Sequence, residues 1–119
     1  YTKTSNVKKA LRKLYKDYQP EVIVATLGKN GSITLINDQI KQIEIFDVKV
    51  KDTTGCGDVY HGAFLFGLLK KWQLLDIMTF ATAVASIKCM HYGAKQGIPD
   101  FEKTINFLKE FGINMDKFI

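Results

Sequence analysis

The chain of 119 residues has little proline and little cysteine, with only two residues of each. Cys56 and Cys89 lie far apart in the sequence and fit neither a CxxC motif nor zinc-ligand spacing, which argues against a zinc module. No secretory signal is recognisable either, so we expect a reducing, cytoplasmic environment. The most apolar segment, residues 77–87, is flanked by Asp76 and Lys88 and is too short to span a bilayer, so we expect a core helix.

Linkers, repeats and low-complexity segments are also lacking, which predicts one domain around a single core. Basic residues outnumber acidic ones by 17 to 12, giving a formal net charge of +5. The local cluster consists of Lys8, Lys9, Arg12, Lys13 and Lys16. Tyr15 is the single aromatic residue within it and is assigned to the buried stripe, so a solvated helix face is favoured over a nucleic-acid footprint, and neither a nucleic acid nor a membrane is an expected partner.

The N-terminal third is predicted to hold a helix and a buried strand. Ser5 or Asn6 is placed to cap a helix that ends near Tyr18, before Pro20. The residues at helical spacing that predict its buried stripe are Val7, Leu11, Leu14 and Tyr15. The run "EVIVATL", residues 21–27, is typical of a parallel strand covered on both faces by helices.

The rest of the chain predicts short strands followed by helices. A turn at "GKNG" leads to "SITLIN" and then to residues 40–50, whose alternation indicates more exposed strands. Helices are expected from Gly57 to about residue 71, from residue 75 to 91, and from a cap at Asp100 to residue 111. This order predicts an α/β layer structure, although two or three parallel strands make a narrow sheet. The chain therefore resembles the C-terminal part of a larger enzyme.

One segment carries recognisable chemistry, the loop "DTTGCGD" at residues 52–58, directly before an apolar helix. Glycines at a helix N-terminus let several N–H groups converge on one anion, which the helix dipole also favours. Asp58 in the first turn is placed to accept a proton from a group that attacks the bound anion. A turn with an ordinary N-terminal carboxylate is the alternative. The Lys-Ser/Thr of a Walker A loop is absent, and Tyr60 stands where a Rossmann fingerprint needs glycine.

This loop resembles the C-terminal signature of the ribokinase-like carbohydrate kinases, also called the phosphofructokinase-B (PfkB) family. Two further blocks are similar in order and spacing: "VIVATLGKNGSI" resembles the strand and glycine turn that meet the nucleotide, and "FATAVASIKCMHYGAKQGIP" resembles the penultimate helix and its loop. The resemblance covers nearly the whole chain and implies the three-layer α/β/α ribokinase-like fold, C-terminal portion only. It implies ATP-dependent phosphorylation of a sugar or sugar-phosphate hydroxyl, with Mg²⁺ as cofactor.

The resemblance also implies roles for the loop residues. Asp58 matches the base that deprotonates the substrate hydroxyl, and Gly55, Cys56 and Gly57 match the backbone anion hole for the γ-phosphoryl group. Cys56 replaces the usual alanine, and its thiol, free at a helix N-terminus, is expected to be unusually acidic unless it is an inert small residue.

The nucleotide contacts are implied elsewhere. Thr26, Gly28 and Gly31 match the turn that contacts the ATP phosphates and ribose, although an ordinary hairpin-type turn is the alternative for the two glycines alone. Thr82 falls where the family often places a residue beside adenine.

Many members bind a monovalent cation such as K⁺ beside the anion hole, mainly through backbone carbonyls. The matching residues here are Asp52, Thr54, Lys88, His91, Gly93 and Gly97. Lys88 is expected to contribute only its carbonyl, because an ammonium group repels a cation. His61 and His91 are not expected to be metal ligands.

The family's sugar-binding residues, magnesium-binding motif and lid would all precede Tyr1, so the isolated chain is expected to lack a substrate site. Fructose, ribose, a sugar phosphate, a ketodeoxy acid and a nucleoside remain open, and a homodimer is one assembly open to the full-length enzyme. A nucleotide-binding regulatory module without catalysis is the alternative function, against which the intact Asp58 argues.

Overall fold

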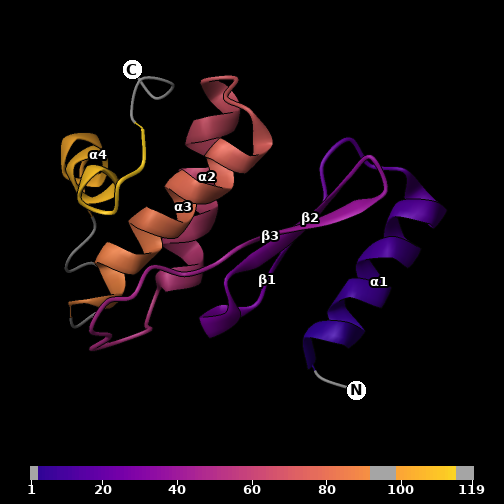
Figure 1. Ribbon diagram of the computed structural model, residues 1–119, viewed down its shortest axis with the longest axis horizontal. Coiled ribbons are helices and arrows are strands. Elements are labelled where there is room, and N and C mark those ends of the chain that lie inside the picture. The colour runs from indigo at the N-terminus through magenta and orange to yellow at the C-terminus, as the bar shows by residue number, and fades with distance from the viewer. Residues whose placement is uncertain (1–2, 92–98, 115–119) are drawn as a thin grey trace. The chain divides into compact units, whose positions relative to one another are not determined.

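The computed structural model describes residues 3–91 and 99–114 (Figure 1). The described residues divide into two compact units, one that ends at Ile45 and one that begins at Phe46. The expectation of a single core is therefore wrong. Each unit has a hydrophobic cluster of its own, one built on Leu11, Ile33 and Leu35 and the other on residues from Tyr60 to Leu108.

The first unit begins with helix α1, Lys3–Tyr18, which packs against the sheet of the same unit. Leu11 is buried as predicted, whereas Leu14 and Tyr15 are 47% and 39% exposed, so the apolar stripe is narrower than expected. The helix starts before Ser5, which rules out the predicted cap. Of the basic cluster, Lys9, Arg12, Lys13 and Lys16 are exposed, which confirms a solvated face.

The sheet consists of β1 (Val24–Thr26), β2 (Ser32–Ile36) and β3 (Gln39–Ile43), paired antiparallel in the order β1-β2-β3. The expected parallel strands and the buried first strand are both wrong. β2 is the buried strand, while β1 is only half-buried and ends exposed at Thr26. The connections are too short for a parallel crossover: the 3₁₀ turn Gly28–Asn30 joins β1 to β2, and two residues join β2 to β3.

The second unit contains three helices: α2 (Cys56–Leu69), α3 (Leu74–Cys89) and α4 (Phe101–Glu110). All three were predicted within two or three residues. α2 and α3 form a closely packed hairpin (Figure 1). Gly67 allows this approach, because a Cβ atom there would lie 2.8 Å from Cγ1 of Ile77.

The predicted cap of α4 is confirmed, since Oδ1 of Asp100 accepts a hydrogen bond from the N–H of Lys103 at 2.8 Å. α3 supplies most of the core of this unit, as expected for the most apolar segment. None of the helices in the described part of the chain has the length and apolar character needed to cross a membrane.

Candidate active site

The loop before α2 is held by its own side chains. Oδ1 of Asp52 accepts hydrogen bonds from the N–H of Thr54 at 2.9 Å and from its hydroxyl at 2.6 Å, which forms an Asx turn. Gly55 follows in the left-handed conformation with φ of 78° and is the N-cap of α2. This conformation favours glycine and turns the chain directly into the helix.

The first turn of α2 presents backbone donors. Among the described residues, the N–H groups of Gly57 and Asp58 have no hydrogen-bond partner, as is usual for a helix N-terminus. The N–H of Cys56 differs, because it donates to the carbonyl oxygen of Thr53 at 3.2 Å. The arrangement therefore offers a partly positive helix end with donors available for an anion, while the predicted Cys56 donor is already engaged.

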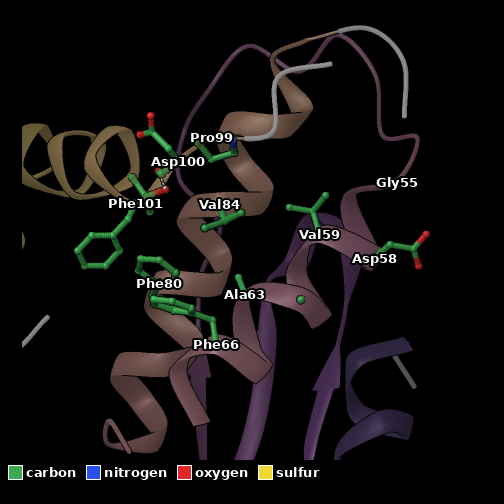
Figure 2. A pocket seen from close by; sticks show the side chains of 12 residues that line it. Gly55, Asp58, Val59, Ala63, Phe66, Phe80, Val84, Pro99, Asp100 and Phe101 are labelled. Atoms are coloured by element: carbon green, nitrogen blue, oxygen red, sulfur yellow. Dashed lines mark hydrogen bonds between the residues drawn. The ribbon is translucent and has the colours of Figure 1, made fainter. Parts of the chain in front are cut away.

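Asp58 stands in this first turn with an exposed side chain. Among the described residues it forms no hydrogen bond or ion pair. Figure 2 shows its carboxylate pointing away from the aromatic rings of Phe66 and Phe80. The group is thus accessible to a reactant and does not support the fold through a contact of its own.

A hollow of about 500 Å³ lies beside this turn, between α2, α3 and the start of α4. Gly55 and Asp58 line it together with mostly apolar residues (Figure 2). No periodic pattern in the sequence indicates this hollow, because its walls are the ordinary apolar faces of three helices.

The end of α3 lies against the same loop. The carbonyl oxygen of Cys89 accepts hydrogen bonds from the N–H groups of Lys51 at 2.8 Å and Asp52 at 3.2 Å. The two segments predicted to share a cation are therefore adjacent. Lys88 is completely buried, and its carbonyl oxygen accepts the N–H of His91 at 3.1 Å.

The rest of the predicted cation site is less well defined. Gly93 and Gly97 lie outside the described residues. Within the described ranges, no group of three or more His, Cys, Asp or Glu residues is placed to hold a metal ion. His61 and His91 accordingly belong to no such cluster there.

The two cysteines are adjacent in space. Cys56, the first residue of α2, and Cys89, the last residue of α3, form a disulfide with a Cα–Cα distance of 6.3 Å. The expectation of a free, acidic Cys56 thiol is wrong in this structure, which has no free cysteine among its described residues. A usable sequence signal existed: two predicted helices of similar length joined by a short turn place the start of one beside the end of the other.

The predicted nucleotide turn belongs to the other unit and is a hairpin connection between antiparallel strands. Gly28 and Gly31 have φ values of 58° and 84°. A Cβ atom on Gly31 would collide with the carbonyl oxygen of Ile43, whereas a Cβ on Gly28 would meet no atom within 4 Å. Gly31 is thus required by the fold itself, and only Gly28 leaves open space next to the exposed Thr26.

Thr82 is buried in α3, and its hydroxyl donates to the carbonyl oxygen of Met78 at 2.6 Å. The side chain is therefore part of the core of the second unit. The structure brings together the predicted residues of the loop and of the end of α3, while Thr26, Gly28 and Gly31 form a separate group in the first unit.

Comparisons with known proteins identify the family of the chain. The family model of the pfkB family carbohydrate kinases matches residues 2–100. The ribokinase of Lactococcus lactis is 35% identical over 106 residues, which are 89% of this chain and 35% of that protein. The 5-dehydro-2-deoxygluconokinase of Clostridium beijerinckii is 34% identical over 110 residues, 92% of this chain and 32% of that protein.

A solved structure shows the same fold. Arabidopsis thaliana ribokinase, complexed with ribose and ATP, superposes with a TM-score of 0.79 at 28% identity, over 88% of this chain and 34% of the ribokinase chain. The chain belongs to the pfkB family of carbohydrate kinases, and the predicted ribokinase-like α/β fold is confirmed. It spans about a third of the length of the curated relatives it matches.

Proposed function

We propose that this chain is the C-terminal, nucleotide-binding and catalytic-base portion of a kinase that transfers the γ-phosphoryl group of ATP to a hydroxyl of a sugar or sugar phosphate. The observation that carries the proposal is the exposed Asp58 in the first turn of α2, directly after the left-handed Gly55 and among N–H groups without partners in the described residues. Membership of the pfkB family and the ATP in the related ribokinase structure support it.

In this proposal the carboxylate of Asp58 accepts the proton of the attacking hydroxyl while the oxygen forms its bond to the γ-phosphorus. The N–H groups of Gly57 and its neighbours in the first turn stabilise the charge that spreads over the equatorial phosphoryl oxygens. Little covalent chemistry is asked of the protein, since phosphoryl transfer depends on positioning and charge stabilisation.

Cation binding belongs to the same proposal. Mg²⁺ enters with ATP as substrate complex and neutralises charge on the phosphates. We propose that a monovalent cation is held by Asp52, Thr54 and the carbonyl groups at the end of α3. The hydrogen bonds from Lys51 and Asp52 to the carbonyl oxygen of Cys89 support this site, because they keep the two segments together.

The substrate is a sugar or sugar phosphate. The named relatives act on different compounds, ribose in one case and 5-dehydro-2-deoxygluconate in the other, at nearly equal identity. A panel of both compounds, fructose and sugar phosphates, assayed with the full-length protein, will identify the acceptor.

The test of the base is Asp58→Asn in the full-length protein. We expect kcat to fall by roughly 10²–10⁴-fold, the usual contribution of a positioned general base, with little change in nucleotide affinity. The amide has nearly the same shape, and Asp58 forms no hydrogen bond or ion pair among the described residues, so folding should persist.

Glu102→Gln is the matched control, because Glu102 is also an exposed acid in the first turn of a helix, α4. Both variants lose a similar interaction with a helix dipole, worth about 0.3–1 kcal/mol. Turnover should stay normal in Glu102→Gln. Normal turnover in Asp58→Asn would remove Asp58 from the mechanism.

A further inference from the structure

The disulfide between Cys56 and Cys89 ties the candidate anion hole to the end of α3. Cys56 is the first residue of α2 and lies between Gly55 and Gly57, whose backbone we propose to bind the γ-phosphoryl group. Cys89 already receives backbone hydrogen bonds from Lys51 and Asp52. With the disulfide in place, both the beginning and the end of the loop are attached to one residue.

This attachment restricts the orientation of the backbone N–H groups in the loop. In the disulfide form the N–H of Cys56 is directed at the carbonyl oxygen of Thr53, at 3.2 Å. Binding a phosphoryl group requires such N–H groups to converge at 2.7–3.1 Å on the anion's oxygens, at roughly the distances found in oxyanion holes. The disulfide is formed by the side chain of the same residue, and this covalent bond opposes the reorientation that would free the donor.

The structure also offers a hydrogen-bond acceptor for the Cys56 thiol of the reduced form. The sulfur of Cys56 lies 3.7 Å from the carbonyl oxygen of Asp52, which can accept the S–H group once the disulfide is opened. Both cysteines are partly exposed, so a small thiol or disulfide can reach them. The Cα–Cα distance of 6.3 Å is within the range that a disulfide bridges without backbone movement.

We propose that Cys56 and Cys89 form a redox switch in which the disulfide holds the anion hole in a form unsuited to phosphoryl transfer and reduction releases it. The switch rests on the proposed kinase function. Both cysteines are partly exposed and their Cα atoms lie 6.3 Å apart, so Cys56 can attack an external disulfide and Cys89 can resolve the mixed disulfide.

The reaction partner is a small-molecule disulfide such as oxidised glutathione. The Cys56 thiolate attacks one of its sulfurs, forms a mixed disulfide and releases one glutathione thiolate. The Cys89 thiolate then attacks the Cys56 sulfur, forms the protein disulfide and releases the second glutathione thiolate. Two protein thiols are oxidised, one glutathione disulfide is reduced, and their two protons pass to solvent or to the released thiolates.

The experiment titrates the full-length protein in glutathione buffers with graded ratios of the reduced and oxidised forms. Alkylation followed by peptide mass mapping measures the fraction with the Cys56–Cys89 bond, and initial rates measure kcat and KM for ATP. We expect kcat to fall by about 10–100-fold as the bond forms, the loss typical of a small misplacement of reacting groups, with recovery on adding dithiothreitol. KM for ATP should change much less than kcat.

Cys89→Ser is the control, since it keeps the backbone carbonyl that holds the loop but cannot form the bond. Its kcat should be independent of the glutathione ratio. An active reduced protein whose kcat stays constant while the bond forms completely would overturn the switch alone, as would a bond that does not form even in fully oxidised buffer. A reduced protein that phosphorylates none of the sugars would overturn the proposed function and the switch together.

Discussion

The substitution Gly57→Ala separates what the first turn of α2 contributes to catalysis from what it contributes to folding. Gly57 is exposed, has ordinary helical φ, and a Cβ atom there would meet no atom within 4 Å. Nothing in the fold therefore requires glycine at this position. Alanine is favoured over glycine by up to about 1 kcal/mol within a helix, so the variant should be as stable as the parent or slightly more stable.

The catalytic rate of Gly57→Ala should fall, whereas its stability should not. The proposed phosphoryl oxygens must approach the N–H of Gly57 to within about 3 Å, and a methyl group on the neighbouring Cα atom occupies part of that approach. A displacement of about 1 Å is worth roughly 10²-fold in rate, or about 2.7 kcal/mol at 1.36 kcal/mol per decade. We expect kcat/KM to fall by roughly this factor while the melting temperature holds or rises.

Gly62→Ala is the matched variant, because Gly62 also lies in α2 and also has open space at its Cβ position. The assay compares kcat/KM for both substrates and the thermal melting temperature of the two full-length variants. Gly62→Ala should gain similar stability and lose much less activity. Unchanged kcat/KM in Gly57→Ala would refute the close approach of a phosphoryl group to this turn.

Two further predictions concern the other unit and the chain in isolation. Gly28→Asn should raise KM for ATP far more than KM for the sugar, because asparagine tolerates the left-handed conformation and its side chain only fills open space. Equal kinetic effects on both substrates in this variant would contradict a nucleotide contact. Gly31→Ala should instead lower the melting temperature, because its Cβ atom collides with the carbonyl oxygen of Ile43. The isolated 119-residue chain should bind ATP weakly and phosphorylate no sugar in a coupled ADP-release assay. It should also self-associate through apolar side chains such as Leu65 and Leu69, which are 60% and 84% exposed. Measurable phosphorylation by this chain alone would show that it holds its own sugar site.

The helices were predictable because their signals are local. Apolar spacing marked α2 and α3, and the Asp100 side chain caps α4 as its position before an amphipathic segment indicated. Strand direction was not predictable in the same way. The run at residues 21–27 is as apolar as a parallel strand, yet β1 covers only part of it and pairs antiparallel, because the short turn of Gly28–Asn30 returns the chain at once.

The sequence also contains a hairpin signal between β2 and β3 that the prediction of parallel strands did not use. Asn37 and Asp38 both have positive φ, at 50° and 66°, in the two-residue connection between β2 and β3. Two residues with positive φ are typical of a tight hairpin, and asparagine and aspartate are among the side chains that tolerate this region. Reading this dipeptide as a hairpin turn would have predicted the antiparallel pair.

By itself the sequence determined the local arrangement of the loop at residues 52–58. Gly55 turns the chain into α2 and Asp58 stands in the first turn, because both positions depend on local backbone geometry and helix polarity. Only the tertiary structure decided which residues from elsewhere meet this loop. Thr82, predicted beside a nucleotide, is buried with its hydroxyl bonded within α3, and Cys89, which is far from Cys56 in the sequence, is joined to it. Such pairings depend on how α2 packs on α3, and packing between helices is set by the fit of many side chains that no short motif records.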